Sequence, residues 1–520
     1  MIPIAGKARR KRDRSEYEPT TRWTACARPI AGYTPGGCRV NIGFLHQYSL
    51  NSSGSGVYTL QVVPRLLERG HRVCIVCRDF HPEKYPFVEE AVLHHGDRTQ
   101  QLFRRADSAR CTVHTLRGPI MAVAYPRSED PNGLLYTDLT DQEISTYVDY
   151  HVERVEYIAR RHRLQLLFAN HVVLMPYVAL QVKRRLGIPY VVAVHGSTIE
   201  YVVNPDERYR RYAVEGLRGA ERVIVLNSEV RDRVLGLDPG LRARLVTVPV
   251  GVDTRLFHAA GVSAAAQSGN GGENGSGPGR RTIAYLGKLS LEKGIHCLIA
   301  ALPLVSARVP DAHLLVIGGG VARESLEDMV AALGRGDLAG AAEFLARAPT
   351  ASQRPGWLRP LTRFWEQVDR PAYLEQAASL PRRVEFTGFV PHPHLAEVLS
   401  RAEMLVIPSL VKEAFPLVSL EALACGVLPM GTYQGGLVPV LDHISETLKL
   451  PIDLIKVDSR EEVFVRDLGL KVAGLLEYLT PEIRTQVASR CRELALQFDW
   501  KHVVARLEKL CVQATEAGKP

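Results

Sequence analysis

The chain lacks any uninterrupted apolar run of about 18 residues, so its sequence predicts no transmembrane helix. Basic residues near the N-terminus have no apolar segment behind them, which argues against a secretory signal. The hydrophobic and charged fractions, 46% and 23%, are ordinary for a soluble globular protein. With 520 residues the chain is too long for a single core, and we expect roughly two to three domains.

Cysteine is sparse and scattered, with nine residues in the chain. Cys74 and Cys77 have a C-x-x-C spacing inside a strand-like run, and residues three apart on a strand point to opposite faces. A shared metal site or redox pair is poor geometry there, so both are interpreted as core cysteines. This pattern fits a reducing compartment, and we expect a cytoplasmic protein.

More than half of the net positive charge lies in the first 38 residues. The formal net charge is +9, and this segment holds eight Lys and Arg against three Asp and Glu, so it carries +5. Residues 1–37 are expected to form a disordered basic leader. A contact with nucleic acid or anionic lipid is an alternative, as is a mis-assigned start codon. We expect no nucleic-acid partner and keep a peripheral contact at the inner membrane surface open.

Strand-like runs alternate with helical patterns in two arrays, which predicts an α/β protein with two parallel, doubly wound, Rossmann-like sheets. The predicted strands are Val40–Leu45, Arg72–Cys77, Cys111–Leu116, Leu164–Ala169, Tyr190–His195, Arg222–Leu226 and Leu245–Pro249, then Thr282–Leu286, His313–Ile317, Val384–Thr387, Met404–Ile407 and Val427–Met430. A Gly- and Ser-rich segment between the arrays builds no core and marks a domain boundary.

The predicted organisation has five parts: the leader (1–37), a first Rossmann-like domain (38–258), a flexible linker (259–281), a second such domain (282–495) and a C-terminal helix (496–520). Residues 321–381 are long for one connection between a strand and the next, so extra helices are expected there. In two such domains facing across a cleft, ligands bind at the carboxyl ends of the strands.

Gly54, Ser55 and Gly56 lie between the first predicted strand and the first predicted helix. Glycines let a ligand approach the backbone, and a helix N-terminus favours anions. The dinucleotide fingerprint G-x-G-x-x-G is incomplete because Thr59 stands at its third glycine. Nicotinamide or flavin binding is therefore disfavoured, and a flexible turn is the alternative.

The loop from Gly287 to Gly294 carries Lys288 and Lys293 and follows the first strand of the second array. It lacks the spacing of a P-loop, but it would present two ammonium groups and free backbone amides to a diphosphate. The alternative is an exposed basic loop.

Two further loops follow predicted strands. His195 ends the strand that precedes Gly196, a position that favours a functional group over a simple polar cap. Gln434–Leu437 places two glycines before a helix, which suits an anion or a sugar.

The most informative segment runs from Val411 to Gly426. Glu413 lies in a loop after a buried strand, and Glu421, eight positions later, lies within a helix. Carboxylates on each side of a helix N-terminus can accept hydrogen bonds from sugar and ribose hydroxyls while the helix dipole faces the phosphates between them.

From about Val40 to Leu510 the chain resembles the family 4 glycosyltransferases, a retaining group with two Rossmann-like domains in the GT-B fold. The matching segments are Gly54–Gly56, Pro249–Asp253 with Phe257, Lys288 with Lys293, Phe386–Val390, Glu413 with Glu421, and Phe498–Trp500 at the start of a last helix that crosses back to the first domain. The leader, the linker and residues 321–381 are unmatched.

The resemblance implies transfer of a sugar from a nucleotide-diphosphate sugar, a UDP- or GDP-sugar, to a carbohydrate, lipid-linked or small-molecule acceptor. It implies the following roles: Lys288 and Lys293 for the diphosphate beside Gly287, Glu413 for donor sugar hydroxyls, backbone contacts from Phe415, Pro416 and Leu417, Glu421 for the ribose, Val390 at the base and His195 near the reacting sugar. No metal or other cofactor is expected, because no Asp-x-Asp motif ends a suitable strand.

The chain departs from the family pattern at four positions: Lys288 replaces an arginine, Ala414 and Pro416 replace glycines, and Gly196 replaces an aspartate. Lysine keeps the charge without the bidentate fork, and Pro416 has no amide proton. Pro416 is expected in the first turn of a helix, so Leu417 must supply the amide instead. These changes concern donor identity more than reaction class. A sugar-nucleotide epimerase of the same fold and a non-catalytic binding subunit are the alternatives.

Overall fold

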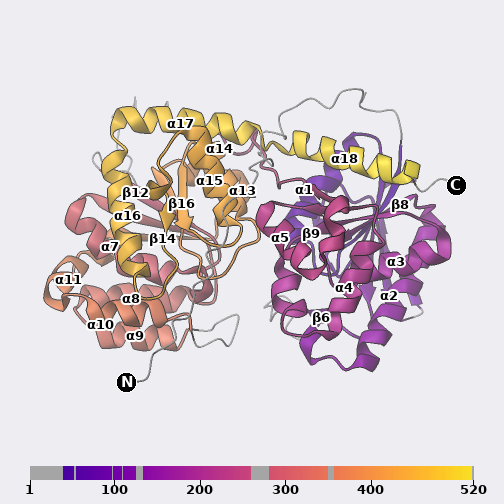
Figure 1. The fold of residues 1–520 in the computed structure, drawn as a ribbon, viewed down its shortest axis with the longest axis horizontal. Coiled ribbons are helices and arrows are strands. Elements are labelled where there is room, and N and C mark those ends of the chain that lie inside the picture. Colours follow the sequence, from indigo (N-terminus) through magenta and orange to yellow (C-terminus); the bar gives the residue numbers. More distant parts are fainter. Residues whose placement is uncertain are drawn as a thin grey trace, which may run out of the picture.

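The computed structural model describes residues 39–51, 54–96, 98–107, 109–124, 133–258, 280–348 and 356–517. The predicted leader and residues 259–279 of the predicted linker lie outside them. Two large sheets, each covered by helices on both faces, lie side by side (Figure 1). The α/β class and the parallel, doubly wound sheets predicted from the sequence are confirmed. The described helices include none that is long and apolar enough to cross a membrane.

The first sheet has the strand order β11-β10-β9-β8-β1-β2-β5-β3-β4 and is parallel except at β4. Its strands are β1 Asn41–Leu45, β2 Arg72–Cys77, β3 Glu90–His95, β4 Arg98–Arg104, β5 Cys111–Arg117, β8 Leu166–Asn170, β9 Tyr190–Val194, β10 Arg222–Val225 and β11 Leu245–Thr247. The chain winds outward from β1 in one direction and then outward from β8 in the other. The β1–β8 boundary is therefore the switch point, where a crevice opens at the carboxyl ends of the strands.

The second sheet is parallel throughout, with the order β14-β13-β12-β15-β16-β17. Its strands are β12 Arg281–Leu286, β13 Ala312–Ile317, β14 Val384–Gly388, β15 Met404–Ile407, β16 Leu428–Thr432 and β17 Lys456–Val457. Its switch point is the β12–β15 boundary, so the loops after these two strands meet. Arg281, assigned to the linker from sequence, is the first residue of β12.

Helices of the first half cover the two faces of its sheet. They are α1 Gly54–Glu68, α2 Asp141–His162, α3 Met175–Leu186, α4 Arg208–Arg218 and α5 Ser228–Leu237, with short turns η2 Pro82–Lys84, η3 Tyr136–Asp138, η4 Ile199–Val203 and η5 Pro239–Arg244. Helices α2, α3 and α4 pack together on one face, and α1 lies on the other. Two short strands, β6 Ala122–Val123 and β7 Leu134–Leu135, pair separately.

Helices of the second half are more numerous. They are α7 Ile295–Arg308, α8 Arg323–Gly334, α9 Leu338–Ala346, α10 Arg359–Gln367, α11 Arg370–Ala377, α12 Leu380–Arg383, α13 His392–Leu399, α14 Leu417–Cys425, α15 Leu437–Leu448, α16 Phe464–Tyr478 and α17 Pro481–Leu496, with η6 Leu291–Lys293 and η7 Ile452–Leu454. Helices α8 to α11 fall within residues 321–381, so the extra helices predicted there are present, and α10 and α11 pack against α7.

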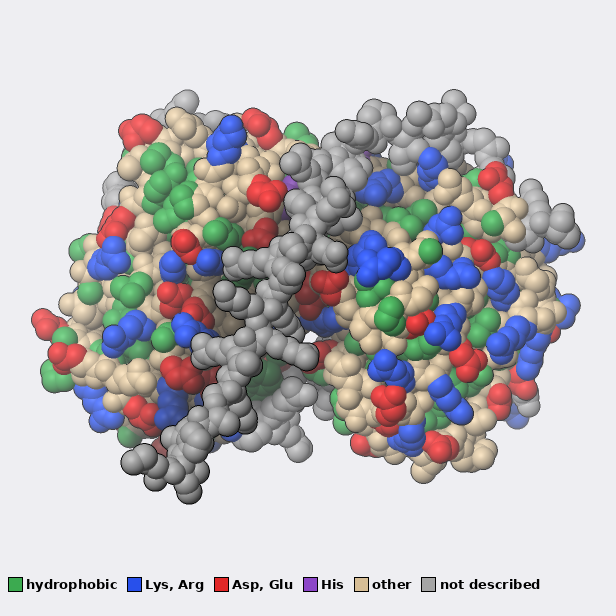
Figure 2. Space-filling view, viewed as in Figure 1, with side chains coloured by type: hydrophobic (Ala, Val, Ile, Leu, Met, Phe, Trp, Pro, Cys, Tyr) green, Lys and Arg blue, Asp and Glu red, His purple; other side chains and the backbone are tan. Residues whose placement is uncertain are grey.

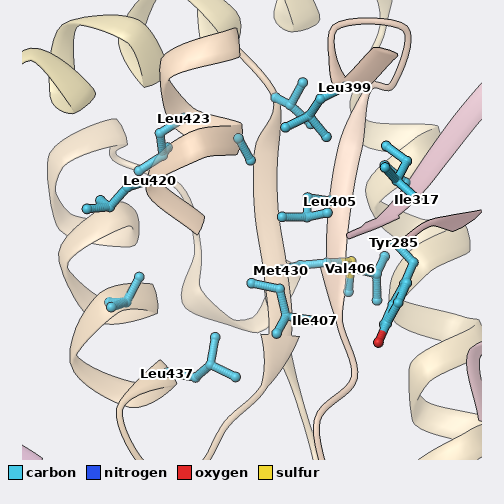
Figure 3. Packing of buried hydrophobic residues seen from close by; sticks show 14 of the residues in the cluster. Tyr285, Ile317, Leu399, Leu405, Val406, Ile407, Leu420, Leu423, Met430 and Leu437 are labelled. Carbon is cyan, nitrogen blue, oxygen red and sulfur yellow. The ribbon is translucent and has the colours of Figure 1, made fainter. Parts of the chain in front are cut away.

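Apolar strand residues explain why the second sheet is buried. Leu405 and Ile407 lie on one face of β15, and Val406 lies on the other face beside its register partner Met430 of β16 (Figure 3). Strands buried on both faces read as continuous apolar runs, and this is why β15 was recognisable as a strand from sequence.

The last helix, α18 Trp500–Ala517, returns to the first half and packs against α1, β8 and β9 (Figure 1). At the crossing the backbone of Val252 bonds Phe498 and Trp500, at 2.9 and 3.1 Å, as an isolated parallel bridge. Gly251 lies so close to Trp500 that a Cβ there would be 2.6 Å from the indole ring. Further along α18, the buried Glu508 accepts from His71 Nε2 at 2.9 Å, which ties the helix to the start of β2.

One hydrophobic cluster continues from the α1 face of the first sheet through Val252, Phe257 and Trp500 into the second half. The two halves of the molecule therefore share a buried apolar contact where α18 crosses between them. The surface shows two lobes with a furrow between them, and Lys and Arg side chains are spread over the lobe of the first sheet (Figure 2).

Candidate active site

The switch point of the second sheet brings two predicted site residues together. Lys293 closes the turn after β12, and Glu413 lies in the loop after β15. Lys293 Nζ lies 2.5 Å from Glu413 Oε1, and both side chains are partly exposed. The two loops are also joined through the backbone, because Leu410 N–H donates to Glu292 C=O at 3.0 Å. Lys293 and Glu413, 120 positions apart in the sequence, thus form one small centre with a cation and an anion side by side.

Polar contacts fix the Glu413 loop in place. Ser409 Oγ donates to Glu413 Oε1 at 2.9 Å, and Gln434 Nε2 donates to Ser409 C=O at 2.8 Å. Gly436 N–H donates to Glu413 C=O at 2.6 Å. A Cβ at Gly436 would lie 2.1 Å from Ala414 C=O, so only glycine allows this approach. The glycines of Gln434–Leu437, interpreted from sequence as an anion or sugar loop, are therefore supports for the Glu413 loop.

The first half of the molecule touches this loop directly. Asn227 caps the start of α5 by accepting from Val230 N–H, and its Nδ2 donates to Ala414 C=O at 2.7 Å. Gly196, which follows β9, has φ +82° and would place a Cβ 2.9 Å from Ala414 Cβ. Residues 196 and 414 therefore meet across the boundary between the two halves.

His195 lies at this boundary, nearly buried at the carboxyl end of β9. Asn170 Nδ2 donates to Leu45 C=O at 3.3 Å, so its Oδ1 faces His195 Nε2 at 2.9 Å and must accept from it. This leaves His195 Nδ1 as the acceptor nitrogen of a neutral ring. Burial lowers the pKa of His195 to about 4, so the ring stays neutral near pH 7.

Aromatic rings cluster, buried, at the first switch point. His171 lies 5.0 Å from His195 and 5.3 Å from Tyr48, measured between ring centroids. Tyr58 of α1 contacts His195 edge-on at 5.2 Å. His171 has φ +69°, a left-handed conformation that costs a non-glycine residue about 1 kcal/mol or more and is typical of functional sites.

Glu421 lies on α14 with its carboxylate partly buried, and it pairs with a residue that sequence reasoning missed. His392 Nε2 lies 3.3 Å from Glu421 Oε1, and this hydrogen bond raises the pKa of His392. The ring of His392 also contacts Phe257 of the first half edge-on at 5.9 Å.

The loop after β12 is backed by a second glycine segment. Leu289 N–H donates to Gly319 C=O at 2.9 Å, and a Cβ at Gly318 would lie 1.9 Å from Gly287 C=O. The glycines 318–320 therefore let the loops after β12 and β13 stack, which leaves the Gly287–Lys288 edge open. Lys288 is exposed, and no described carboxylate lies within ion-pair distance of its ammonium group.

Comparison with known proteins assigns this arrangement to a family. A family model described as a glycosyl transferase 4-like domain matches residues 53–251, and two described as glycosyl transferases group 1 match residues 271–341 and 366–454. The chain belongs to the group 1 glycosyltransferases of the GT-B fold. The predicted resemblance is thereby confirmed.

Several named proteins share parts or all of this fold. D-inositol 3-phosphate glycosyltransferase of Pseudarthrobacter chlorophenolicus is 25% identical over 78% of this chain and 81% of its own length. The chain spans just over half the length, 54% and 57%, of two other curated relatives. Sucrose-phosphate synthase of Thermosynechococcus elongatus superposes with a TM-score of 0.58, at 20% identity, covering 92% of this chain and all of that one. Anabaena HepE, solved with UDP-glucose, superposes with a TM-score of 0.52, at 15% identity, covering 91% and 99%.

Within this glycosyltransferase, the structure brings Lys288, Lys293, Glu413 and the start of α14 to the β12–β15 switch point, with His195 facing them from the first half. Val390, partly exposed, follows β14 beside the highly exposed Phe389. The positions fit the predicted roles, which themselves stay predictions.

Two local predictions were wrong. Gly54, Ser55 and Gly56 form the first turn of α1 instead of a loop before it, since a Cβ at Gly56 would lie 2.1 Å from Leu50 C=O and the helix starts against that carbonyl. Pro416 is the N-cap of α14 rather than a residue of its first turn, so Leu417 begins the helix. Leu417 therefore offers the first amide of the helix, as the missing Pro416 amide required.

Sequence reasoning missed Asn170, Asn227, Ser409, His392 and the glycines 318–320. Asn170 ends β8, Asn227 follows β10 as the N-cap of α5, and the glycine run follows β13, so the place of each at the end of a strand is a usable signal. Ser409 and His392 had no such signal in the sequence, because their roles depend on the residues that they contact in the folded chain.

The contact between Gly196 and Ala414 predicts coupled substitutions. Gly196→Ala should lower the free energy of unfolding by about 1–2 kcal/mol, because φ +82° disfavours an L-residue and the new methyl group meets Ala414. Adding Ala414→Gly should recover part of this loss, with a coupling of about 0.5 kcal/mol or more in a urea-denaturation cycle. Gly236→Ala, which meets nothing within 4 Å, is the matched control. Additive effects of the two substitutions would contradict the contact.

Proposed function

We propose that this glycosyltransferase transfers a sugar from a UDP- or GDP-sugar to an acceptor with retention at the anomeric carbon and without a metal ion at the diphosphate. The Lys293–Glu413 pair at the switch point of the second sheet carries the proposal, because it places a phosphate-binding cation beside a hydroxyl-binding carboxylate. At such a point the two parts of one donor would bind side by side. Its phosphates would lie against the helix starts and its sugar against the carboxylate. The UDP-glucose held by Anabaena HepE, a protein of this fold, supports a nucleotide-sugar donor.

Negative charge grows on the diphosphate as the glycosidic bond loosens. Lys293 would turn from Glu413 toward the β-phosphate, and Lys288, which is exposed at the same loop, would meet the other phosphate. The amides at the start of α14, beginning with Leu417, add fixed donors. Preorganised cations and amides of this kind stabilise a leaving group in the way that a metal ion does in other sites.

The two glutamates divide the sugars of the donor between them. Glu413, already held by Ser409 Oγ, would accept from hydroxyls of the transferred sugar. Glu421, one turn into α14, would accept from the ribose, with Val390 and its neighbours against the base and His392 as the group that Glu421 gives up. Phe415 and Pro416 would offer backbone contacts between these two ends, because they lie in the loop that joins Glu413 to α14.

His195 suits a polar contact to the reacting sugar better than general base catalysis. Its low pKa makes it a poor base, and Nδ1 is a neutral acceptor that a sugar hydroxyl can meet. Retention then follows from attack on the face that the diphosphate leaves, with the departing phosphate oxygen taking the acceptor proton. No protein nucleophile is required in this route.

The acceptor would enter the crevice of the first sheet, between His171, Tyr48 and the start of α1. Gly54, Ser55 and Gly56 form the first turn of α1, which follows β1 at the same switch point. A carbohydrate, a lipid-linked or a small-molecule acceptor remains open, and the spread of Lys and Arg over this lobe suits a peripheral contact with an anionic surface (Figure 2).

Nucleotide release tests the proposal. The full chain is incubated with UDP-glucose or GDP-mannose and excess EDTA, and free nucleotide is measured with and without candidate acceptors. Glu413→Ala should lower the rate about 100-fold or more, as removal of a preorganised polar contact does in other enzymes. Glu446→Ala, on the exposed side of α15, is the control.

Four outcomes would contradict this assignment. Normal turnover in Glu413→Ala removes the carboxylate from the reaction. Loss of activity in EDTA that magnesium restores refutes metal independence. Conversion of the donor sugar without an acceptor points to the epimerase, and no release with any donor points to a binding subunit.

Lys293 should contribute to nucleotide affinity. Lys293→Ala is expected to weaken UDP binding about 10- to 100-fold in calorimetry, because a hydrogen bond to a charged group contributes about 1.5–3 kcal/mol. The matched control is Lys471→Ala on α16, whose Nζ bonds Asp453 C=O away from the switch point. Equal affinity in the two variants would place the diphosphate elsewhere.

Donor binding should also depend on the protonation of His392. The hydrogen bond to Glu421 raises the pKa of His392. The His392–Glu421 ion pair is therefore fully formed at pH values below the ordinary pKa of histidine, and it is lost as the pH rises through the raised pKa. Glu421 is then free for the ribose, and UDP-glucose, whose phosphates do not titrate near neutral pH, should bind about two- to five-fold more tightly at pH 8 than at pH 6, as exposed pairs contribute about 0.2–1 kcal/mol. His392→Gln should flatten this dependence, whereas the neighbouring His394→Gln should keep it. A pH dependence that survives in His392→Gln would sink the idea.

A further inference from the structure

A cluster of imidazoles and one thiol lies in the first half, away from the switch points. Cys74 of β2, His114 of β5 and His162 of α2 each offer a ligand atom, and the three atoms all lie within 4.8 Å of one another. His114 Nε2 is 2.9 Å from His162 Nε2. Cys74 and His114 are buried, and His162 is half-buried.

Strand register explains why these side chains meet. In the register of β2 and β5, Cys74 lies opposite Thr112 and Val76 lies opposite His114. Cys74 and His114 are therefore offset by two positions along the strands and point to the same face of the sheet. That face is covered by α2, and its last turn, which ends at His162, comes down over β2 and β5. Cys77 points to the opposite face, so the C-x-x-C spacing has no part in the cluster.

We propose that Cys74, His114 and His162 bind a transition-metal ion, of which Zn²⁺ fits the donor set best. Thiolate and imidazole are the ligands that Zn²⁺ takes in proteins, at about 2.3 Å for sulfur and about 2.0–2.1 Å for nitrogen. Around a tetrahedral ion two nitrogens lie about 3.3 Å apart, so the His114 and His162 rings need to separate by about half an ångström. The Cys74 thiol proton passes to solvent when the ion binds.

His94 supplies the outer contact that metal-binding histidines need. Its Nε2 lies 2.9 Å from His114 Nδ1, on the side of the ring away from the ion. His114 can therefore donate Nδ1–H to His94 and keep Nε2 free for the metal, which fixes its tautomer and orientation. Burial lowers the pKa of His94 and His114, so both rings are neutral and ready to serve as acceptor and ligand.

Charges of both signs surround the cluster. Beside the effect of burial, Arg154 and Arg161 lower the pKa of His94, whereas Glu90, which accepts from Thr112 Oγ1 at 3.3 Å, opposes Arg161 and Arg72 at His162. The Cys74 thiolate and the Glu90 carboxylate are the negative charges nearest the ion, and Arg72 acts against Glu90 at Cys74. The half-buried His162 gives the ion a way in, and a water molecule can complete the coordination.

The site is structural rather than catalytic in its position. Cys74 is the third residue of β2, and His162 ends α2, so the cluster lies toward the amino ends of the strands. The transfer site lies at their carboxyl ends. A bound ion would clamp the end of the longest helix onto the β2–β5 pair, and its absence would leave a chain of neutral, hydrogen-bonded imidazoles.

Cobalt reports on the thiolate directly. The full chain, stripped with a chelator and titrated with Co²⁺, should develop the thiolate-to-cobalt charge-transfer absorption at about one ion per chain. Cys74→Ala should abolish that band, and Cys77→Ala, an equal truncation on the opposite face, should keep it. Absence of the band in the parent chain, or its survival in Cys74→Ala, would overturn the proposal.

A second measurement holds even where Cys74→Ala fails to fold. His162→Gln, at a half-buried helix end, should fold and lose at least about 100-fold in Zn²⁺ affinity by calorimetry, and Zn²⁺ should no longer raise its denaturation midpoint. His95→Gln, at the exposed end of β3, should behave as the parent chain. Zn²⁺ binding of equal strength in both variants would mean surface histidines only, and the proposal would fail.

Discussion

The contact between Lys293 and Glu413 is the constraint on which the site depends. Each lies in a loop after a strand at the centre of the second sheet, and each is placed by a different crossover. Because β12 and β15 are neighbours only through the reversal of winding direction, the pair can exist only in a doubly wound sheet. The fold is therefore the cause of the chemistry: the same reversal that opens a crevice brings an ammonium group and a carboxylate to 2.5 Å.

The pair also explains why so much of the surrounding chain is glycine. Gly436 must approach Ala414 C=O, and Gly318 must approach Gly287 C=O, more closely than any side chain allows. These glycines let four loops stack, and in that arrangement Glu413 accepts from Ser409 Oγ and pairs with Lys293.

The sequence predicted the sheets well because each central strand is buried on both faces and reads as a continuous apolar run, as β15 does. It missed the β3–β4 hairpin, where β4 is mostly exposed and lacks such a run. It predicted Glu413 and Lys293 as site residues from their place after strands, which is local information. It missed His392 and Asn227, because a histidine at a helix start and an asparagine cap become site residues only through partners far along the chain, Glu421 and Ala414.

The departures from the family pattern are better understood in space than in sequence. Ala414 replaces a glycine and Gly196 replaces an aspartate, and read singly each suggests a weakened site. In the structure the two positions face each other, with 2.9 Å between Ala414 Cβ and a Cβ at residue 196. The family pattern has a side chain at residue 196 and none at residue 414, whereas this chain has none at Gly196 and a methyl group at Ala414. The space between the halves is therefore still filled, from the opposite side. The pair therefore accounts for both departures together: the two halves meet here through an apolar methyl group, at a place where the family pattern has a carboxylate.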